Sequence, residues 1–196
     1  MNYLLIALLW ALYCALHSFL ISTGFTKLMM RLLKKYFAFY RLFYIIFSLA
    51  LIIPLFKLQS PSDYEIITYP ATLDIIRQVL MYGSLIMFGW AFFFDYDALS
   101  FFGIRQIMEF GKKKNSSIPE IKRKGLLGII RHPMYLVLII FLWSKVFTLT
   151  DLIVNSVLTV YVIIGTVLEE RKLVLEFGDA YTNYKNEVPM LIPFTK

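Results

Sequence analysis

Cysteine is almost absent from this chain, whose 196 residues include only Cys14. One cysteine cannot form an intramolecular disulfide, and it excludes a zinc site built from several cysteines. A glycine-rich dinucleotide-binding fingerprint is also missing, no segment repeats, and the one low-complexity tract is the polar stretch GKKKNSSIPE at 111–120, which we expect to be a solvated loop. Hydrophobic sequence is therefore the main guide to the fold.

Apolar residues dominate the composition, because 59% of the chain is hydrophobic. A helix needs about 20 apolar residues to cross a hydrocarbon core of roughly 30 Å. Five segments approach this length: 3–25, 40–56, 73–94, 133–148 and 152–168. The sequence thus predicts an all-α integral membrane protein with five transmembrane helices, the last two of which form a helical hairpin.

Acidic residues are the minority charge, with 13 Asp and Glu against 20 Lys and Arg. In a chain this apolar, clustered bases indicate orientation and contact with anionic lipid headgroups rather than nucleic acid. Bases without acids occupy 26–39, and a basic cluster occupies 95–132, so the positive-inside rule places both connections in the cytoplasm. We expect an N-terminus outside, a cytoplasmic C-terminus and a bacterial inner membrane location, and we interpret the first segment as a retained span rather than a signal peptide.

The predicted organisation is one membrane domain over 1–196. Three N-terminal spans occupy 1–94, a basic cytoplasmic loop 95–132, the hairpin 133–168, and a cytoplasmic tail 169–196. Because the hairpin returns to its starting side, its two open ends should lie close together.

The two open ends of this hairpin carry the chemistry. Arg131 and His132 directly precede Pro133, a residue suited to the first turn of a helix, whose unpaired N–H groups favour an anion. Glu169 and Glu170 follow the last apolar segment, where we expect the helix to end and its dipole to oppose them. A structural Arg–Glu clamp explains one acid; two acids with a histidine and an arginine favour a functional site.

The tail beyond the glutamates combines aromatic residues with prolines. Leu173, Phe177, Tyr181 and Tyr184 recur at helical spacing, and prolines at 189 and 193 predict an extended end. The two tyrosines are either anchors at the membrane interface or part of a binding site. A partly apolar pocket with aromatic walls and fixed charges would suit a zwitterionic nucleoside ligand.

Several short motifs follow one another here: Arg-His-Pro-Met-Tyr at 131–135, Glu-Glu at 169–170, Phe-Gly at 177–178, Val-Pro at 188–189 and Ile-Pro at 192–193. This series of motifs resembles the integral membrane methyltransferases. That group includes isoprenylcysteine carboxyl methyltransferase and phospholipid N-methyltransferases, which use S-adenosylmethionine. The resemblance implies a cytoplasmic S-adenosylmethionine site in the tail and hairpin mouth, and no metal. The residues it assigns to the cofactor are Arg131, His132, Tyr135, Glu169, Glu170, Tyr181 and Tyr184.

The N-terminal half resembles one branch of this group. Three stretches carry this resemblance: His17-Ser18, Tyr-Arg-Leu-Phe-Tyr at 40–44, and FDYDALSFFGIRQ at 94–106. They are similar to the NnrU-like branch, which contains the methanethiol S-methyltransferases. This implies a small or lipophilic thiol as the methyl acceptor. The chain has Asp151 near the hairpin turn, where the thiol enzymes have histidine.

Methyl transfer from a sulfonium carbon needs in-line positioning and dryness more than acid–base chemistry. A thiol must still lose its proton, and His132 or His17 can accept it; Glu169 or Glu170 can face the cofactor's cation. The catalytic candidates are therefore His132, His17 and Glu169. The alternatives are a lipid amine or prenylcysteine carboxylate as acceptor, an NADPH-dependent membrane reductase, and a non-catalytic regulatory membrane protein.

Overall fold

The computed structural model describes residues 3–58, 70–111, 121, 123–145 and 148–195. Within these residues the secondary structure is helical, without a strand. The chain divides into two compact units. The first unit comprises Met1–Tyr64, Ala98–Ser116 and Leu149–Leu158, and the second comprises Glu65–Asp97, Ser117–Thr148 and Thr159–Lys196.

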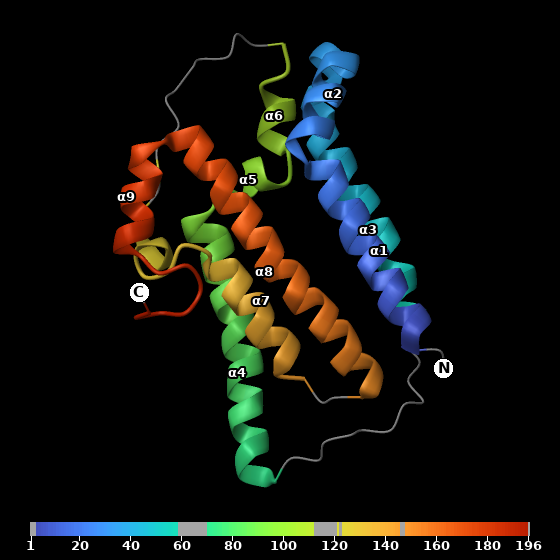
Figure 1. The fold of residues 1–196 in the computed structure, drawn as a ribbon, viewed down its shortest axis with the longest axis vertical. Helices are drawn as coiled ribbons and strands as arrows, with labels where there is room; N and C mark the ends of the chain where they lie inside the picture. The colour runs from blue at the N-terminus through green and yellow to red at the C-terminus, as the bar shows by residue number, and fades with distance from the viewer. Residues whose placement is uncertain (1–2, 59–69, 112–120, 122, 146–147, 196) are drawn as a thin grey trace. The chain divides into compact units, whose positions relative to one another are not determined.

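The first unit is built on two long apolar helices, α1 (Tyr3–Ile21) and α3 (Tyr40–Leu58), which lie side by side (Figure 1). Its other elements are α2 (Thr23–Leu33), the 3₁₀ turn η1 (Lys34–Phe39), α5 (Ala98–Phe101), α6 (Ile104–Met108) and the first part of α8 (Leu149–Phe177). Ile6, Trp10 and Val154 form its buried cluster. The Ser22 hydroxyl accepts a hydrogen bond from the Phe25 N–H and so begins α2.

The second unit holds α4 (Ala71–Trp90) beside α7 (Pro133–Trp143), as Figure 1 shows. A π-helical turn η2 (Ala91–Asp95) ends α4, and a 3₁₀ turn η3 (Gly125–Gly128) precedes α7. The remainder of α8 follows, and α9 (Asp179–Glu187) comes after Gly178, whose φ of 60° breaks the helix. His132 is the N-cap of α7 and Pro133 lies in its first turn, as predicted.

Among the described residues, four helical segments are long and apolar enough to cross a membrane: Tyr3–Ile21, Thr23–Leu58, Ala71–Asp95 and Leu149–Phe177. This confirms the prediction of an all-α protein with several membrane-spanning helices. The predicted fourth span, 133–148, contains the shorter helix α7, which ends at Trp143. At about 1.5 Å per residue, α7 covers roughly half of a 30 Å hydrocarbon core. The described residues thus contain four helical segments of spanning length and one shorter apolar helix, α7.

The short helix α7 can end where it does because α4 satisfies its last turn. The Ser144 carbonyl accepts a hydrogen bond from Arg77 Nη1 at 3.2 Å, and Arg77 is also paired with Asp74 at 2.7 Å. The Trp143 indole N–H donates to the Thr159 hydroxyl at 2.9 Å. A buried helix end needs such partners for its free carbonyl groups, and a basic side chain on a neighbouring helix supplies one here.

One boundary prediction was wrong. Glu169 and Glu170 were expected at the C-terminus of the last span, but α8 continues to Phe177, about two turns further. The loss of apolar residues after Leu168 does not end the helix, because no helix breaker occurs before Gly178. The predicted loop at 111–120 and the basic residues Lys112–Lys114 lie, apart from Gly111, outside the described residues.

Candidate functional site

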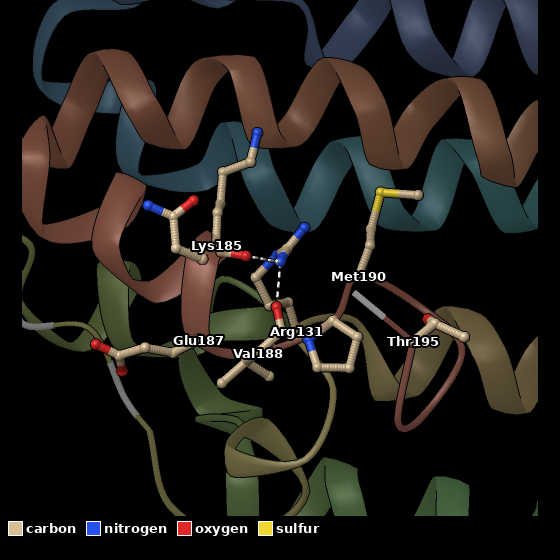
Figure 2. Close-up of a pocket in the computed structure, with 8 residues that line it drawn as sticks. Arg131, Lys185, Glu187, Val188, Met190 and Thr195 are labelled. Carbon is tan, nitrogen blue, oxygen red and sulfur yellow. Dashed lines mark hydrogen bonds between the residues drawn. The ribbon is translucent and has the colours of Figure 1, made fainter.

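A buried ion pair lies at the centre of the site in the second unit. Arg131 Nε contacts Glu170 Oε1 at 2.6 Å, and the two side chains are 6% and 7% exposed. Lys185 Nζ contacts the other oxygen of Glu170 at 3.2 Å. Figure 2 shows Arg131 Nη1 donating to the carbonyl groups of Lys185 and Val188. One guanidinium thus joins α7, α8, the end of α9 and the tail, which makes Arg131 primarily an organiser of the site.

The second glutamate has a different environment. The Glu169 side chain is 42% exposed, against 7% for Glu170. Its Oε2 accepts a hydrogen bond from the Tyr135 hydroxyl at 2.7 Å. Since Tyr135 holds this carboxylate and solvent still reaches it, Glu169 is the acid of the pair that remains open to a ligand.

His132 lies between the two acids. Its Nδ1 is 3.8 Å from Glu169 Oε2, and its Nε2 is 3.3 Å from Glu170 Oε1 without hydrogen-bond geometry, so Nε2 is buried with no hydrogen-bond partner. The ring stacks on Tyr135 with centroids 5.5 Å apart. Burial lowers the pKa of His132 below its usual range, although Glu169 and Glu170 oppose this shift. The imidazole is therefore neutral near pH 7 and able to accept a proton.

Tyr181 and Tyr184 lie in a buried cluster with Val188. Their rings meet edge to face at 5.7 Å, and the Tyr184 hydroxyl donates to the Leu127 carbonyl at 2.5 Å. Burial raises the pKa of both phenols. This environment gives both tyrosines a packing role beside the charged groups and keeps their phenols neutral.

A cavity of about 250 Å³ adjoins the arginine, and Figure 2 shows several of the side chains that line it. Its lining residues are Arg131, Lys185, Asn186, Glu187, Val188, Pro189, Met190 and Thr195. This volume lies below the roughly 300–1,000 Å³ of most ligand pockets. No group of three or more His, Cys, Asp or Glu suited to a metal occurs among the described residues.

His17 belongs to the first unit. The Tyr44 hydroxyl and His17 Nε2 form a hydrogen bond, and the rings of Tyr13 and Tyr44 lie 5.9 and 5.1 Å from the His17 ring, centroid to centroid. The other predicted site residues, Arg131, His132, Tyr135, Glu169, Glu170, Tyr181 and Tyr184, all belong to the second unit. His17 thus contacts aromatic residues of the first unit, Tyr13 and Tyr44.

Several curated proteins are similar to this chain over most of its length. Methanethiol S-methyltransferase 1 of Bradyrhizobium diazoefficiens is 30% identical over 192 residues, covering 96% of this chain and 66% of that protein. The methanethiol S-methyltransferase of Crocosphaera subtropica is 30% identical over 156 residues, covering 77% of this chain and 60% of that protein. That of a Pseudomonas species is 28% identical over 190 residues, covering 95% and 72%.

The chain is a homologue of the methanethiol S-methyltransferases. The resemblance to membrane methyltransferases of the NnrU-like branch is thereby confirmed. The chain spans 60% and 66% of the length of the first two of these homologues. No protein-family model and no solved structure matches it.

Two contacts around the site residues could not be predicted from the sequence. Lys185, which binds Glu170, lies four residues after Tyr181, and that spacing on a helix was the available signal. Tyr44, the partner of His17, closes the Tyr-Arg-Leu-Phe-Tyr motif. In both cases the residues were visible in the sequence, but the contact between them was not.

Proposed function

We propose that this chain is a membrane methyltransferase that transfers a methyl group from S-adenosylmethionine to a small or lipophilic thiol such as methanethiol. The observation that carries the proposal is the similarity to methanethiol S-methyltransferase 1, which covers 96% of the chain. The arrangement around Glu169 and Glu170 is consistent with it, because one acid is neutralised inside the protein and the other stays open.

The site residues fit a donor that carries a sulfonium, an ammonium and a carboxylate. When bound, S-adenosylmethionine supplies the methyl group on its positively charged sulfur. Glu169, oriented by Tyr135, places a negative charge where it attracts the cation, and Lys185 at the cavity attracts the carboxylate. Arg131 and Glu170 hold these groups in place, and Tyr181 and Tyr184 pack beside them.

On the acceptor side, the thiol must lose a proton as its sulfur takes the methyl group. His132 is neutral near pH 7 and can accept that proton. His17, held by Tyr44 within an apolar helix, is the other candidate, since polar groups inside membrane helices are commonly functional. An apolar thiol reaches such a site through lipid more easily than a charged acceptor does.

A methyl-transfer assay on the purified protein tests the proposal. Radiolabelled S-adenosylmethionine is offered with methanethiol and its homologues, with phosphatidylethanolamine, or with a prenylcysteine. We expect methylation of the small thiols. Efficient methylation of the lipid amine or the carboxylate, without methylation of the thiols, would contradict the proposal that a thiol is the methyl acceptor. Binding of NADPH instead of S-adenosylmethionine would favour a reductase, and binding of neither would favour a regulatory protein.

The proposal includes one membrane domain with five helices in the membrane, α7 among them, an N-terminus outside and a cytoplasmic C-terminus in a bacterial inner membrane. Cys14 is the only cysteine, so Cys14→Ala provides a background for single-cysteine labelling. Cysteines at the exposed positions Arg31 and Arg171 should react with an impermeant thiol reagent only from the cytoplasmic side. Labelling of either from outside would contradict this orientation.

A further inference from the structure

A buried carboxylate lies outside the glutamate cluster, at the end of α4. Asp95 is 7% exposed and is the last residue of the π-helical turn η2. The turn closes with a hydrogen bond from the Tyr96 N–H to the Ala91 carbonyl at 3.0 Å, which leaves the chain extended at Tyr96. Such turns are rare and often occur at functional sites.

The carboxylate of Asp95 contacts the turn η3, which leads to the site. Asp95 Oδ2 accepts a hydrogen bond from the Leu126 N–H at 3.3 Å. Gly125 has a φ of +62°, and a Cβ atom there would lie 2.1 Å from Asp95 Oδ1. The carboxylate thus occupies the space of a side chain at position 125, and only glycine combines this backbone conformation with this contact.

The segment from this turn to the site is held at both ends. Asp95 holds its start, and the tail holds its end, where the Arg131 N–H donates to the Pro189 carbonyl at 2.9 Å and the His132 N–H to the Met190 carbonyl at 3.1 Å. Between these two ends, the Leu127 carbonyl accepts a hydrogen bond from the Tyr184 hydroxyl. Only three residues separate Gly125–Gly128 from His132, so the position of the turn limits where Arg131 and His132 can lie.

We infer that Asp95 is a positioning residue for the cofactor site: its carboxylate holds the Gly125–Gly128 turn so that Arg131 and His132 meet Glu169 and Glu170. The inference rests on the proposed function for what the site binds. Stability alone does not account for Asp95, because a buried carboxylate costs free energy that an apolar residue of similar size would not. The role requires an acceptor oxygen at this point, which asparagine can also supply.

A double-mutant cycle tests the contact. Asp95→Ala, Gly125→Ala and the combined variant are compared by hydrogen exchange of the 123–132 segment without ligand and by S-adenosylmethionine affinity. Asp95→Ala should speed exchange in this segment and raise the Kd by about tenfold, the size of one lost hydrogen bond, while the KM for the thiol changes little. Gly125→Ala should cost less in the Asp95→Ala background, because the clash has gone and only the backbone strain remains.

Two further variants sharpen the result. Asp95→Asn should retain the wild-type exchange rate and most of the affinity, since its side-chain oxygen still accepts from Leu126. Gly83→Ala, on α4 with no atom within 4 Å of the added Cβ, is the control and should change neither readout.

Additive effects of Asp95→Ala and Gly125→Ala, or wild-type exchange in Asp95→Ala, would overturn the inference. If Asp95→Ala does not fold, Asp95→Asn decides: loss of affinity equal to that of Arg131→Ala would show that charge matters rather than position. If the wild-type protein does not bind S-adenosylmethionine, the proposed function fails, and the exchange measurements still test the contact between Asp95 and the turn.

Discussion

The two units of the molecule treat buried charge differently. Among the described residues, the buried Asp, Glu, Arg and His side chains are Asp95, Glu170, Arg131 and His132, and all four belong to the second unit. The first unit buries an aromatic and aliphatic cluster, and its one histidine is half-buried among tyrosine rings. Since an unpaired buried charge is costly, charges gather where partners are available. The second unit therefore gathers the buried charged side chains, whereas the polar residues buried in the first unit, Ser48, Thr150 and Asn155, are uncharged.

The largest expected effect comes from removing half of the buried pair. Arg131→Ala or Glu170→Ala leaves the other charge buried, and each should lower the free energy of unfolding by about 3–5 kcal/mol and, in the folded fraction, weaken S-adenosylmethionine binding. Denaturant unfolding in detergent and calorimetric titration measure the two effects.

The control for the stability effect, though not for binding because Glu187 lines the cavity, is Glu187→Gln in the second unit. It breaks the pair of Arg123 and Glu187, whose side chains are 40% and 60% exposed, and should cost less than about 1 kcal/mol. Equal losses of unfolding free energy in the buried and the exposed pair would contradict the prediction that burial sets the cost of breaking a pair.

His17, in the first unit, should affect turnover instead. His17→Ala removes a proton acceptor and should lower kcat about 100-fold if His17 serves the thiol, while the Kd for S-adenosylmethionine stays nearly constant. Tyr44→Phe removes the hydroxyl that contacts His17 and should lower kcat by a smaller factor. Steady-state kinetics at saturating cofactor separate these quantities. A loss of cofactor affinity in either variant would contradict the division of roles between the units.

The open acid should affect affinity without affecting stability. Tyr135→Phe removes a hydrogen bond to a charged carboxylate, and we expect cofactor binding to weaken by about 1.5–3 kcal/mol. Glu169→Gln should act in the same direction. Both variants should unfold at nearly the wild-type denaturant concentration, because the Glu169 side chain is already partly solvated. Strong destabilisation by Glu169→Gln would show that the two glutamates do not differ as proposed.

The smallest effect concerns pH. The pKa of His132 lies below its ordinary value of about 6.5, so between these two values the unfolded chain binds more protons than the folded one. Stability should fall as the pH drops from about 6.5 toward the folded pKa, by at most about 1.4 kcal/mol per pH unit. His132→Gln should lack this component. Unfolding of both proteins between pH 5 and 8 checks it, and parallel curves would contradict it.

Local sequence predicted that Arg131 and His132 lie close to Glu169 and Glu170, because the signals that mark these helix ends are local. Pro133 and the preceding His132 mark the start of α7, and an apolar run followed by two acids marks α8. The end of α8 was misplaced, since hydrophobicity reports where lipid ends and not where a helix ends. The distinction between Glu169 and Glu170 could not be predicted, because neighbouring residues on a helix point in different directions and only the packed partners reveal which one is buried.

The sequence by itself determined the all-α membrane class, the methyltransferase resemblance and the residue types at the hairpin mouth. These follow from composition, periodicity and short motifs, which depend on neighbours along the chain. Tertiary structure decided that Arg131 is enclosed by protein partners, that Lys185 joins Glu170, and that Asp95 supports the turn before the site. These contacts join residues 15 to 57 positions apart, and their energies depend on burial and geometry that no local pattern encodes.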